Sequence, residues 1–471
     1  MRFHSVDESD CAAFRAIVGD ENVVQEPKVL TRHAHDMTED LVFPPQVVVR
    51  PRNTAEVSAL LSLCHAQGIA VTPQGRRTSL SGGALPVHGG VALSMEHFDK
   101  ILGIDMDNYQ VTVEPYVLNF DLRTAVEAKG LFYPPDPASY RICSIGGNLA
   151  EGSGGPKCVK YGTTKDYVLN LEVVLADGRV IWTGANTLKN VTGYNLTQLF
   201  VVSEGTLGVI TKGVLRLIPK PKFDKLMVVS FSVMQDAGRA VNVVLGAGIV
   251  PSAIEFMERN ALIAAQEYTK VTFPEVGQTT RAHLILEFDG ADEGVVAQDA
   301  ARAEALLRQA FPSIEYVVSA RSDEEKESLW KLRRSALTAA KSRSHCKEED
   351  LVVPRSFLPQ TVELLDTLKA RYGIDFIAWG HAGDGNLHVC LMQKDHSREE
   401  FERLCVPYLH DLFAQVCGVF HGAVTAEHGV GYVQRGPMAD MLGPDVVGLM
   451  RAIKTLLDPR GILNPGKIFL D

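Results

Sequence analysis

Long apolar runs are missing from this chain of 471 residues. A helix that spans a membrane needs about 20 consecutive apolar residues, and we expect no transmembrane segment because no stretch approaches that length. The first ten residues, MRFHSVDESD, lack the apolar core and the cleavage signal of a secretion leader. These absences favour a cytoplasmic protein, with any membrane association made through a partner.

An excess of basic residues is also missing. The chain has 47 Lys and Arg against 57 Asp and Glu, which gives a formal net charge of −10. Proteins that bind nucleic acid carry basic stripes that pair with phosphates, so we expect no nucleic-acid partner. The 46% hydrophobic and 22% charged residues are typical of globular proteins, and the length indicates more than one domain.

Closely spaced cysteines are absent as well. The eight cysteines are scattered along the chain, and none forms a C-x-x-C pair. Disulfide frameworks and iron–sulfur clusters both depend on such spacing. The sequence therefore predicts reduced thiols and no iron–sulfur cluster within this chain.

Helix and strand patterns predict a fold of the α/β or α+β class. Strands over Gln46–Pro51 and Ile69–Gly75 flank a helix that starts at the capping residue Asn53 and ends at Gly68. An Asp-Gly turn makes Asn170–Gly184 a hairpin, and further strands are expected over Leu199–Pro221. After the Pro-rich boundary at residues 219–222, strands alternate with long helices. We therefore expect domains at 1–221 and 222–440, with 441–471 returning to the first.

Four glycine clusters stand before that boundary. PQGRRTSLSGGALP (73–86) follows a strand, and SIGGN, GSGG and SEGTLG come later. The phosphate-binding patterns G-x-x-x-x-G-K-[ST] and G-x-G-x-x-G are both absent there. Glycines let backbone N–H groups approach a ligand closely. A single cluster is equally consistent with a turn, but four together predict a long diphosphate cofactor lying against the backbone. The glycines of GAGIVPS (246–252) follow a helical stretch and are set aside.

Two short stretches concentrate histidine. GHAGDGNLH places His381 and His388 on either side of a glycine turn, and AEHG supplies Glu427 and His428. On one straight strand a spacing of seven would put the two histidines on opposite faces, whereas a hairpin lets them converge. Two imidazoles and a carboxylate suit a divalent transition metal. The alternative is histidines that are hydrogen-bonded to the backbone.

His428 is a candidate general base, because imidazole titrates near neutral pH. Neighbouring side chains are expected to point apart, so that Glu427 faces the metal and His428 the substrate. A helix over SLWKLRRSAL (328–337) offers Arg333 and Arg334, and arginine pairs with carboxylates in a bidentate manner. The alternative for His428 is a buried histidine bonded to the backbone.

The motifs resemble those of a known family. PQGRRTSLSGGALP, YPPDPAS, CSIGGNLAEGSGG and FVVSEGTLGVIT resemble the FAD-binding domain of vanillyl-alcohol-oxidase or PCMH-type flavoproteins. GHAGDGNLH, AEHGVG and DPRGILNPGK resemble the subgroup of FAD-dependent 2-hydroxy acid dehydrogenases, which includes glycolate oxidase, D-lactate dehydrogenase and D-2-hydroxyglutarate dehydrogenase. The motifs span residues 45 to 468. The resemblance implies a PCMH-type FAD-binding domain of two subdomains and an α/β cap domain with an antiparallel sheet.

The resemblance also implies the residues that bind FAD. They come from the glycine-rich segments and the C-terminal tail, and are Pro73, Gly75, Arg76, Arg77, Thr78, Ser79, Gly82, Pro135, Asp136, Ser139, Gly146, Gly147, Asn148, Ser153, Gly154, Glu204, Gly208, Ile210 and Asn464. Thr78 stands near the place of the histidine that carries covalent FAD in other members, so non-covalent FAD is expected, with Cys143 as a less favoured attachment point. Relatives have small residues where Arg76 and Arg77 stand, which leaves contact with the pyrophosphate or with a partner protein open.

The implied activity is oxidation of a small D-2-hydroxy acid to the 2-oxo acid. His381, His388 and Glu427 would hold the metal, Zn²⁺ by preference with Fe²⁺, Mn²⁺ or Co²⁺ as alternatives. His428 would take the hydroxyl proton and Arg333 would orient the carboxylate. Relatives place a lysine near the next strand, where this chain has Lys347 in an uncertain register.

Two other functions stay open at this stage. One is a non-redox ether-lipid synthase, and the other is a subunit that only relays electrons. The expected acceptor is an iron–sulfur protein, an electron-transfer flavoprotein or a quinone. A homodimer is left open, and the sequence does not distinguish glycolate, D-lactate and D-2-hydroxyglutarate.

Overall fold

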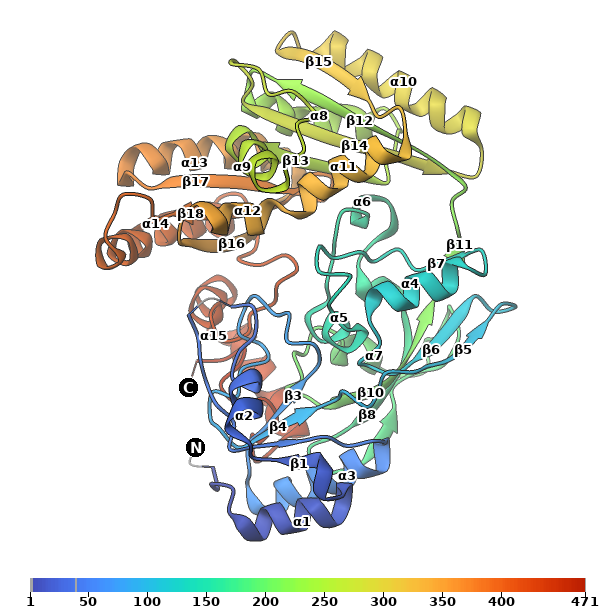
Figure 1. Cartoon of the computed structure of the whole chain (residues 1–471), viewed down its shortest axis with the longest axis vertical. Coiled ribbons are helices and arrows are strands. Elements are labelled where there is room, and N and C mark those ends of the chain that lie inside the picture. The colour runs from blue at the N-terminus through green and yellow to red at the C-terminus, as the bar shows by residue number, and fades with distance from the viewer. Residues whose placement is uncertain (1–2, 39, 471) are drawn as a thin grey trace. The chain divides into compact units, whose positions relative to one another are not determined.

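The computed structural model describes residues 3–38 and 40–470, and its contacts divide the chain into two compact units. Unit 1 comprises Met1–Ser153, Thr163–Lys220 and Glu427–Asp471, and unit 2 comprises Gly154–Gly162 and Pro221–Ala426. Each unit therefore combines segments that are distant in sequence. Figure 1 shows the course of the chain through them.

Unit 1 contains two main sheets. A four-stranded sheet has the order β1-β2-β4-β3, and a five-stranded sheet has the order β5-β6-β10-β8-β9. Strands β2, β4 and β3 are parallel, whereas the five-stranded sheet is antiparallel throughout. The strands are β1 (Val23–Val24), β2 (Val47–Val49), β3 (Val71–Gln74), β4 (Val91–Ser94), β5 (Ile101–Asp105), β6 (Gln110–Val113), β8 (Val168–Val174), β9 (Val180–Trp182) and β10 (Val209–Arg216), with β7 (Leu131–Phe132) and β11 (Ile218–Pro219) forming a separate ribbon.

The helices of unit 1 are mostly short. Helix α3 confirms its prediction, since the Asn53 side chain accepts from the Glu56 N–H at 3.0 Å and Gly68 ends the helix in the left-handed region at φ 73°. The helices are α1 (Glu8–Val18), α2 (Pro27–His33), α3 (Thr54–Gln67), α4 (Asn119–Glu127), α5 (Ile145–Glu151), α7 (Leu196–Phe200) and α15 (Arg435–Leu457).

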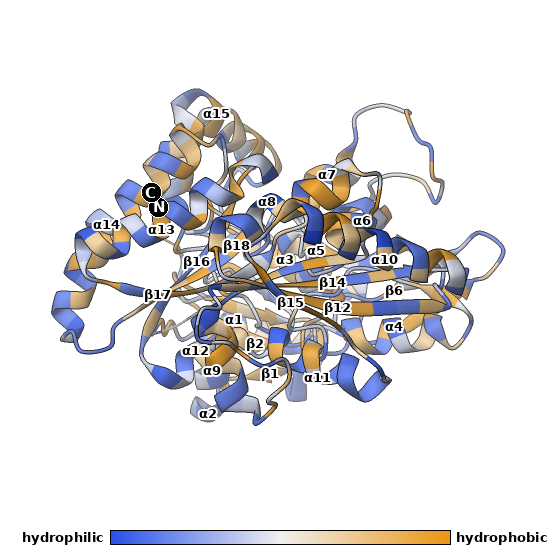
Figure 2. Cartoon of the chain, turned by 90° about the horizontal axis from the view of Figure 1, so that it is seen from above, coloured by the Kyte–Doolittle hydropathy of each residue, from blue (hydrophilic) through white to orange (hydrophobic). Residues whose placement is uncertain are grey.

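Unit 2 is built on one antiparallel sheet of seven strands in the order β15-β12-β14-β13-β17-β18-β16. Both faces carry helices (Figure 2), and each face has its own apolar core. Helices α8, α10, α13 and α14 cover one face, and α9, α11 and α12 the other. The elements are β12 (Phe223–Phe231), β13 (Ala253–Glu258), β14 (Ala282–Gly290), β15 (Ile314–Ser319), β16 (Cys346–Val352), β17 (Asp375–His381), β18 (Asn386–Met392), α6 (Cys158–Tyr161), α8 (Met234–Gly246), α9 (Arg259–Thr269), α10 (Glu293–Ala310), α11 (Asp323–Arg334), α12 (Ala336–Arg343), α13 (Leu358–Tyr372) and α14 (Arg398–Gly418).

Two expected elements are wrong in part. The strand prediction over Leu199–Pro221 holds only from Val209 onward, because Val202 and Glu204 have left-handed backbones at φ 64° and 50°, which no extended strand allows. The helix expected over 328–337 is interrupted at Ser335, between α11 and α12. The Asn170–Gly184 hairpin is confirmed, since β8 pairs with β9 in antiparallel register.

Candidate active site

Unit 1 contains a cavity of about 830 Å³, counting the space that is open to solvent. Most of the predicted FAD-binding residues line it. Glu151, Ser144 and Ser203 line it as well and were not predicted. The predicted residues in its wall are Pro73, Gly75, Arg76, Arg77, Thr78, Ser79, Gly146, Gly147, Glu204, Gly208, Ile210 and Asn464.

Several glycines in this wall, including Gly75 and Gly146, have no room for a side chain. A Cβ atom on Gly75 would lie 2.4 Å from Ser144 Oγ, and one on Gly146 would lie 2.5 Å from Pro115 Cβ. The Ser144 hydroxyl itself accepts from the Gly147 N–H and caps α5. Backbone therefore forms much of the wall, as a cofactor held by peptide groups requires.

Other predicted FAD residues do not line this cavity in the described structure. Asn148 is buried and binds Asn119 and Ser153 through its side-chain amide. Gly82 donates its N–H to Thr38 Oγ1 at 2.6 Å. Gly154 belongs to the short segment of unit 2. The predicted residues outside the cavity wall are Gly82, Pro135, Asp136, Ser139, Asn148, Ser153 and Gly154, and their contact with FAD stays a prediction.

Arg77 brings positive charge to the cavity. Its backbone is left-handed at φ 56°, and one Nη lies 3.5 Å from Nδ1 of His33. That nitrogen also lies 2.6 Å from Gln74 Oε1. Burial lowers the pKa of His33 to about 4, so this histidine is neutral at pH 7. Burial also lowers the pKa of Arg77. A partly buried guanidinium beside a neutral imidazole suits an anionic ligand.

Arg76 is engaged differently, because its guanidinium lies 4.1 Å from the centroid of the Tyr116 ring.

Cys143 does not belong to the cavity wall. Its thiol contacts the Asn148 amide at 3.3 Å, and burial raises its pKa. A thiol kept protonated by burial is a weak nucleophile.

Two carboxyl groups reach the same cavity, those of the half-buried Glu151 and of the buried Glu204. Burial raises the pKa of Glu151 to about 8 and that of Glu204 to about 7. Their mutual repulsion contributes to the shift of Glu151, whereas a hydrogen bond from Ser79 opposes it. Near them, burial lowers the pKa of Lys467 to about 7. Glu151 lies in the glycine-rich segment AEGSGG, but nothing in the local sequence indicates that its side chain reaches the cavity.

In unit 2, the hairpin of β17 and β18 brings His381 and His388 onto one face of the sheet. Trp379 pairs with His388 in the antiparallel register, and His381 lies two residues further along β17 on the same side. The ring centroids are 5.4 Å apart, and ligand nitrogens of the two rings lie within 4.8 Å of each other. The predicted convergence across the turn is confirmed.

Each histidine has a carboxylate at Nδ1. The carboxylate oxygens of Glu255 lie 2.9 and 3.0 Å from Nδ1 of His381. Asp350 pairs with His388 across β16 and β18, with 3.4 Å between Oδ1 and Nδ1. At His381 the hydrogen-bonded carboxylate fixes the imidazole tautomer and leaves the Nε2 lone pair for a metal, whereas the Asp350 contact with His388 is longer and electrostatic. The donor set therefore fits a divalent cation bound by imidazole nitrogen.

Arg333 packs against this cluster. Its side chain is buried, and Nε lies 2.6 Å from Glu255 Oε2. One Nη lies 3.4 Å from Nδ1 of His381. Glu255 thus joins the arginine and the histidine, and it was missed because its strand, β13, is distant in sequence and only the sheet register places it opposite His381.

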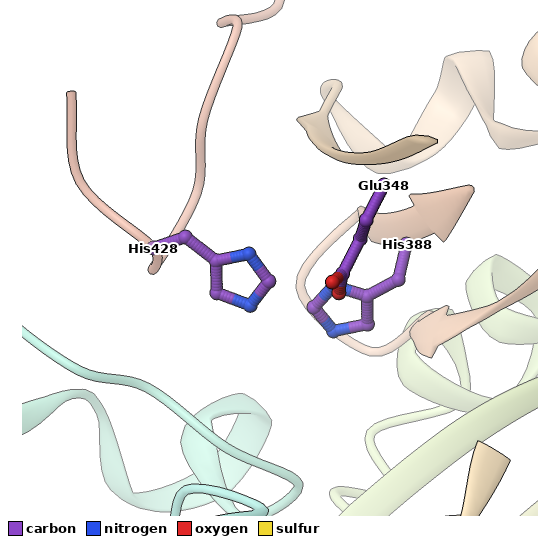
Figure 3. Close-up of side chains that lie close together, drawn as sticks. All are labelled: Glu348, His388 and His428. Atoms are coloured by element: carbon purple, nitrogen blue, oxygen red, sulfur yellow. The ribbon is translucent and has the colours of Figure 1, made fainter. Parts of the chain in front are cut away.

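Strand β16 contributes further polar groups. Glu348 and Asp350 share the face of His388, and the side chains of Glu348 and His388 lie close together (Figure 3). Lys347, whose register the sequence left open, lies on the opposite face of β16 from Asp350 and is exposed. Glu348 is therefore a second candidate carboxylate ligand, which strict alternation along CKEEDLV would have indicated once the register was known.

Glu427 and His428, the latter also labelled in Figure 3, open the last segment of unit 1. The preceding Ala426 belongs to unit 2, where its N–H donates to Asp350 Oδ2 at 2.8 Å. Thr425 Oγ1 binds the same oxygen at 2.9 Å. The expectation that the two neighbouring side chains point apart is wrong, because His428 Nε2 lies 4.0 Å from Glu427 Oε1.

Comparisons with known proteins extend over both units. Residues 45–184 match the family described as FAD binding domain, and residues 220–468 match FAD linked oxidases, C-terminal domain. The chain is 39% identical to glycolate oxidase subunit GlcD of Bacillus subtilis over 438 residues, which are 93% of this chain and 92% of that protein. It is 35% identical to D-lactate dehydrogenase of Anaerostipes hadrus over 428 residues, 90% and 89% of the two chains.

Solved structures share the fold. That of p-cresol methylhydroxylase with substrate bound has a TM-score of 0.81 at 20% identity and covers 99% of this chain and 98% of its own. That of alkyldihydroxyacetonephosphate synthase has a TM-score of 0.76 at 17% identity and covers 99% and 87%. At this identity the likeness concerns the PCMH-type α+β fold alone, which confirms the predicted fold class.

The two domain matches and the relatives define an FAD-linked protein of the oxidoreductase class. The chain belongs to the FAD-linked oxidase family, whose glycolate oxidase and D-lactate dehydrogenase members resemble it over nearly its whole length. Among the described helices, none combines the length and apolar character that a bilayer crossing demands.

Proposed function

We propose that the protein oxidises a small D-2-hydroxy acid to the 2-oxo acid, with D-lactate, glycolate and D-2-hydroxyglutarate as candidate substrates. The observation that carries this proposal is the pair His381 and His388, each with a carboxylate at Nδ1, beside the buried Arg333. The names of the similar glycolate oxidase and D-lactate dehydrogenase support the substrate class.

The proposed metal ligands are His381, His388 and Glu427, with Zn²⁺ as the preferred ion and Fe²⁺, Mn²⁺ or Co²⁺ as alternatives. The hydrogen bond from Ala426 to Asp350 supports the inclusion of Glu427, since Asp350 is also the partner of His388 and Glu427 is the next residue of the chain. When bound, the ion supplies Lewis acidity toward the substrate hydroxyl and carboxylate. Glu348 is the alternative carboxylate, because it lies close to His388.

The proposed FAD is non-covalent. The glycine-rich wall around Gly75 and Gly146 leaves backbone N–H groups for its diphosphate, and Arg77 offers a cation. When bound, the flavin accepts the hydride from the substrate Cα. The buried, protonated thiol of Cys143 is a poor candidate for covalent attachment.

Two side chains of this protein are proposed to act on the substrate directly. His428 accepts the hydroxyl proton, and Arg333 orients the substrate carboxylate. Arginine has five N–H donors; here Nε faces Glu255 and one Nη lies near His381. The substrate would thus lose a hydride to the flavin and a proton to His428, and become the 2-oxo acid.

The electrons then pass to a separate acceptor, for which an iron–sulfur protein, an electron-transfer flavoprotein or a quinone is proposed. A similar protein is named as a subunit of glycolate oxidase, which supports assembly with other chains. We place the protein in the cytoplasm, with membrane association only through such a partner.

Turnover with an artificial electron acceptor tests the activity. The FAD-loaded protein is assayed with D-lactate, L-lactate, glycolate and D-2-hydroxyglutarate, and formation of the 2-oxo acid is quantified. The proposal expects product from at least one D-acid or glycolate and little from L-lactate. Product from L-lactate alone, or ether-bond formation without a redox change, would contradict it.

A further inference from the structure

The carboxylate of Glu204 is bound by the backbone next to His428. Oε1 accepts the N–H of Val430 at 2.8 Å, and Oε2 accepts the N–H of Gly431 at 2.7 Å. The side chain is buried, with 5% of the residue exposed. Both oxygens are therefore committed to two successive peptide groups, an arrangement that suits an anion.

The backbone of Glu204 is itself fixed on both sides. Its N–H donates to Ala150 O at 2.9 Å, and its carbonyl accepts from the Asn464 side chain at 2.7 Å. Glu204 lies in the SEGTLG turn and has a left-handed backbone at φ 50°, which sets the direction of its side chain. Ala150 and Asn464 both line the cofactor cavity, as does Glu204. The anchor thus belongs to the wall that surrounds the proposed FAD site.

The anchored segment has little space to move. Ser81 O accepts the N–H groups of Tyr432 at 2.8 Å and Val433 at 3.2 Å. A Cβ atom on Gly431 would lie 2.2 Å from the same Ser81 oxygen. A Cβ atom on Gly429, where φ is 80°, would lie 3.0 Å from Glu204 Oε1. Glycine is needed at both positions, because a side chain would displace the turn from its carboxylate.

We propose that Glu204 is a positioning residue, whose carboxylate fixes the 429–431 turn and thereby the placement of His428 relative to the flavin. This inference rests on the proposed role of His428 as general base. It adds to the expected part of Glu204, which was predicted only as a residue that contacts FAD. The carboxylate acts through the backbone that follows the base.

The chemistry of the carboxylate is specific to this task. A glutamine side chain of the same length has one oxygen that accepts and one NH₂ group that only donates. At position 204 it would satisfy one of the two peptide N–H groups and set a donor against the other. His428 would then sample several placements, and hydride and proton transfer require a defined one. The cavity wall would keep its shape, so FAD affinity is expected to change little.

Three variants test the inference: Glu204→Gln, Gly429→Ala and the double variant. Gly436→Ala is the control, since a Cβ there meets nothing within 4 Å. Flavin reduction is followed anaerobically by stopped-flow with the best hydroxy acid, and FAD affinity by fluorescence. We expect a fall of at least tenfold in the limiting rate for each single variant, with KM and FAD affinity within threefold of the unmodified protein. The double variant should be no slower than the slower single variant, because both changes disturb one contact.

Hydrogen exchange of the peptide that covers 427–433 gives a readout independent of activity. Exchange should rise in Glu204→Gln and stay unchanged in Gly436→Ala. A Glu204→Gln variant that reduces its flavin at the normal rate, or that loses FAD in proportion to its rate, would overturn the positioning role and leave the proposed function standing. If no hydroxy acid reduces the flavin of the unmodified protein, the proposed function fails. Unchanged hydrogen exchange of residues 427–433 in Glu204→Gln would separately show that the carboxylate does not hold the turn.

Discussion

Glu255 and His381 are joined across two strands, with 2.9 Å between Oε1 of the carboxylate and Nδ1 of the imidazole. The other carboxylate oxygen binds Arg333 at 2.6 Å. One fully buried acid thus orients a proposed metal ligand and neutralises the proposed substrate-binding cation. Removing its charge should affect both.

Replacement of Glu255 by glutamine is therefore expected to weaken metal binding and stability together. Loss of a carboxylate behind a histidine ligand typically costs 10–100-fold in metal affinity, and an uncompensated buried arginine costs about 3 kcal/mol. Competition with a chromogenic chelator measures the affinity, and chemical denaturation the stability. Glu267→Gln, an exposed carboxylate paired with Arg343, is the control. Unchanged metal affinity would remove Glu255 from the site.

His388→Ala should release the metal and leave FAD in place. The imidazole is a proposed ligand in unit 2, whereas the cavity proposed for FAD lies in unit 1. Metal content by mass spectrometry should fall below a tenth of the normal value, with the flavin-to-protein ratio unchanged. The surface residue His410 on α14 provides a matched histidine, and His410→Ala should lose nothing. Full metal content in His388→Ala would contradict the ligand assignment.

His428→Ala should stop flavin reduction while both FAD and metal stay bound. Removal of a general base slows the chemical step by about 100-fold or more. Stopped-flow absorbance under anaerobic conditions gives the rate, and the spectrum before mixing gives the FAD content. Reduction at the normal rate would mean that another group takes the hydroxyl proton.

Arg77→Gly separates backbone strain from cofactor binding. Glycine accepts the left-handed backbone at φ 56° that costs other residues about 1 kcal/mol. The melting temperature of the FAD-free protein should therefore hold or rise slightly. FAD affinity should fall about tenfold, because a charged hydrogen bond to the diphosphate is lost. Arg76→Ala, whose guanidinium lies on Tyr116, is the comparison. Unchanged FAD affinity would assign Arg77 to another ligand.

Glu151 should make stability depend on pH. Its folded pKa of about 8 is above the ordinary 4.5, so folding favours the protonated acid. The stabilisation is complete below pH 4.5 and is lost as the pH rises through 8. Glu151→Gln should lose less stability between pH 5 and pH 9 than the unmodified protein, by on the order of 3 kcal/mol. Glu204 titrates in both proteins, but its repulsion from Glu151 is present only in the unmodified protein, so part of the difference reports this repulsion. Parallel pH profiles would contradict the raised pKa.

Local signals were enough for part of the fold. The Asn53 cap and Gly68 bounded α3, and the Asp-Gly turn gave the β8–β9 hairpin. They failed at Val202 and Glu204, because tertiary hydrogen bonds hold these residues in the left-handed region where their β-rich sequence predicts a strand.

The candidate site, like the fold, was predictable from the sequence only in part. The hairpin of His381 and His388 follows from its own glycine turn, and the glycine clusters predicted most of the cavity wall. Glu255 and Asp350 were not predictable, since only the register of a seven-stranded sheet sets them opposite the two histidines. The hydrogen bonds from the N–H groups of Val430 and Gly431 to the Glu204 carboxylate join positions more than 200 residues apart, so no local sequence pattern predicts them.

The most direct test of the central claim is anaerobic visible absorbance of the FAD-loaded protein. Glycolate, D-lactate, L-lactate and D-2-hydroxyglutarate are added one at a time, before and after treatment with a metal chelator. The account predicts that at least one D-acid or glycolate bleaches the flavin, that chelation abolishes the bleaching, and that added Zn²⁺ or another divalent ion restores it. A flavin that stays oxidised with all four acids, or that bleaches equally well after complete removal of metal, would contradict it.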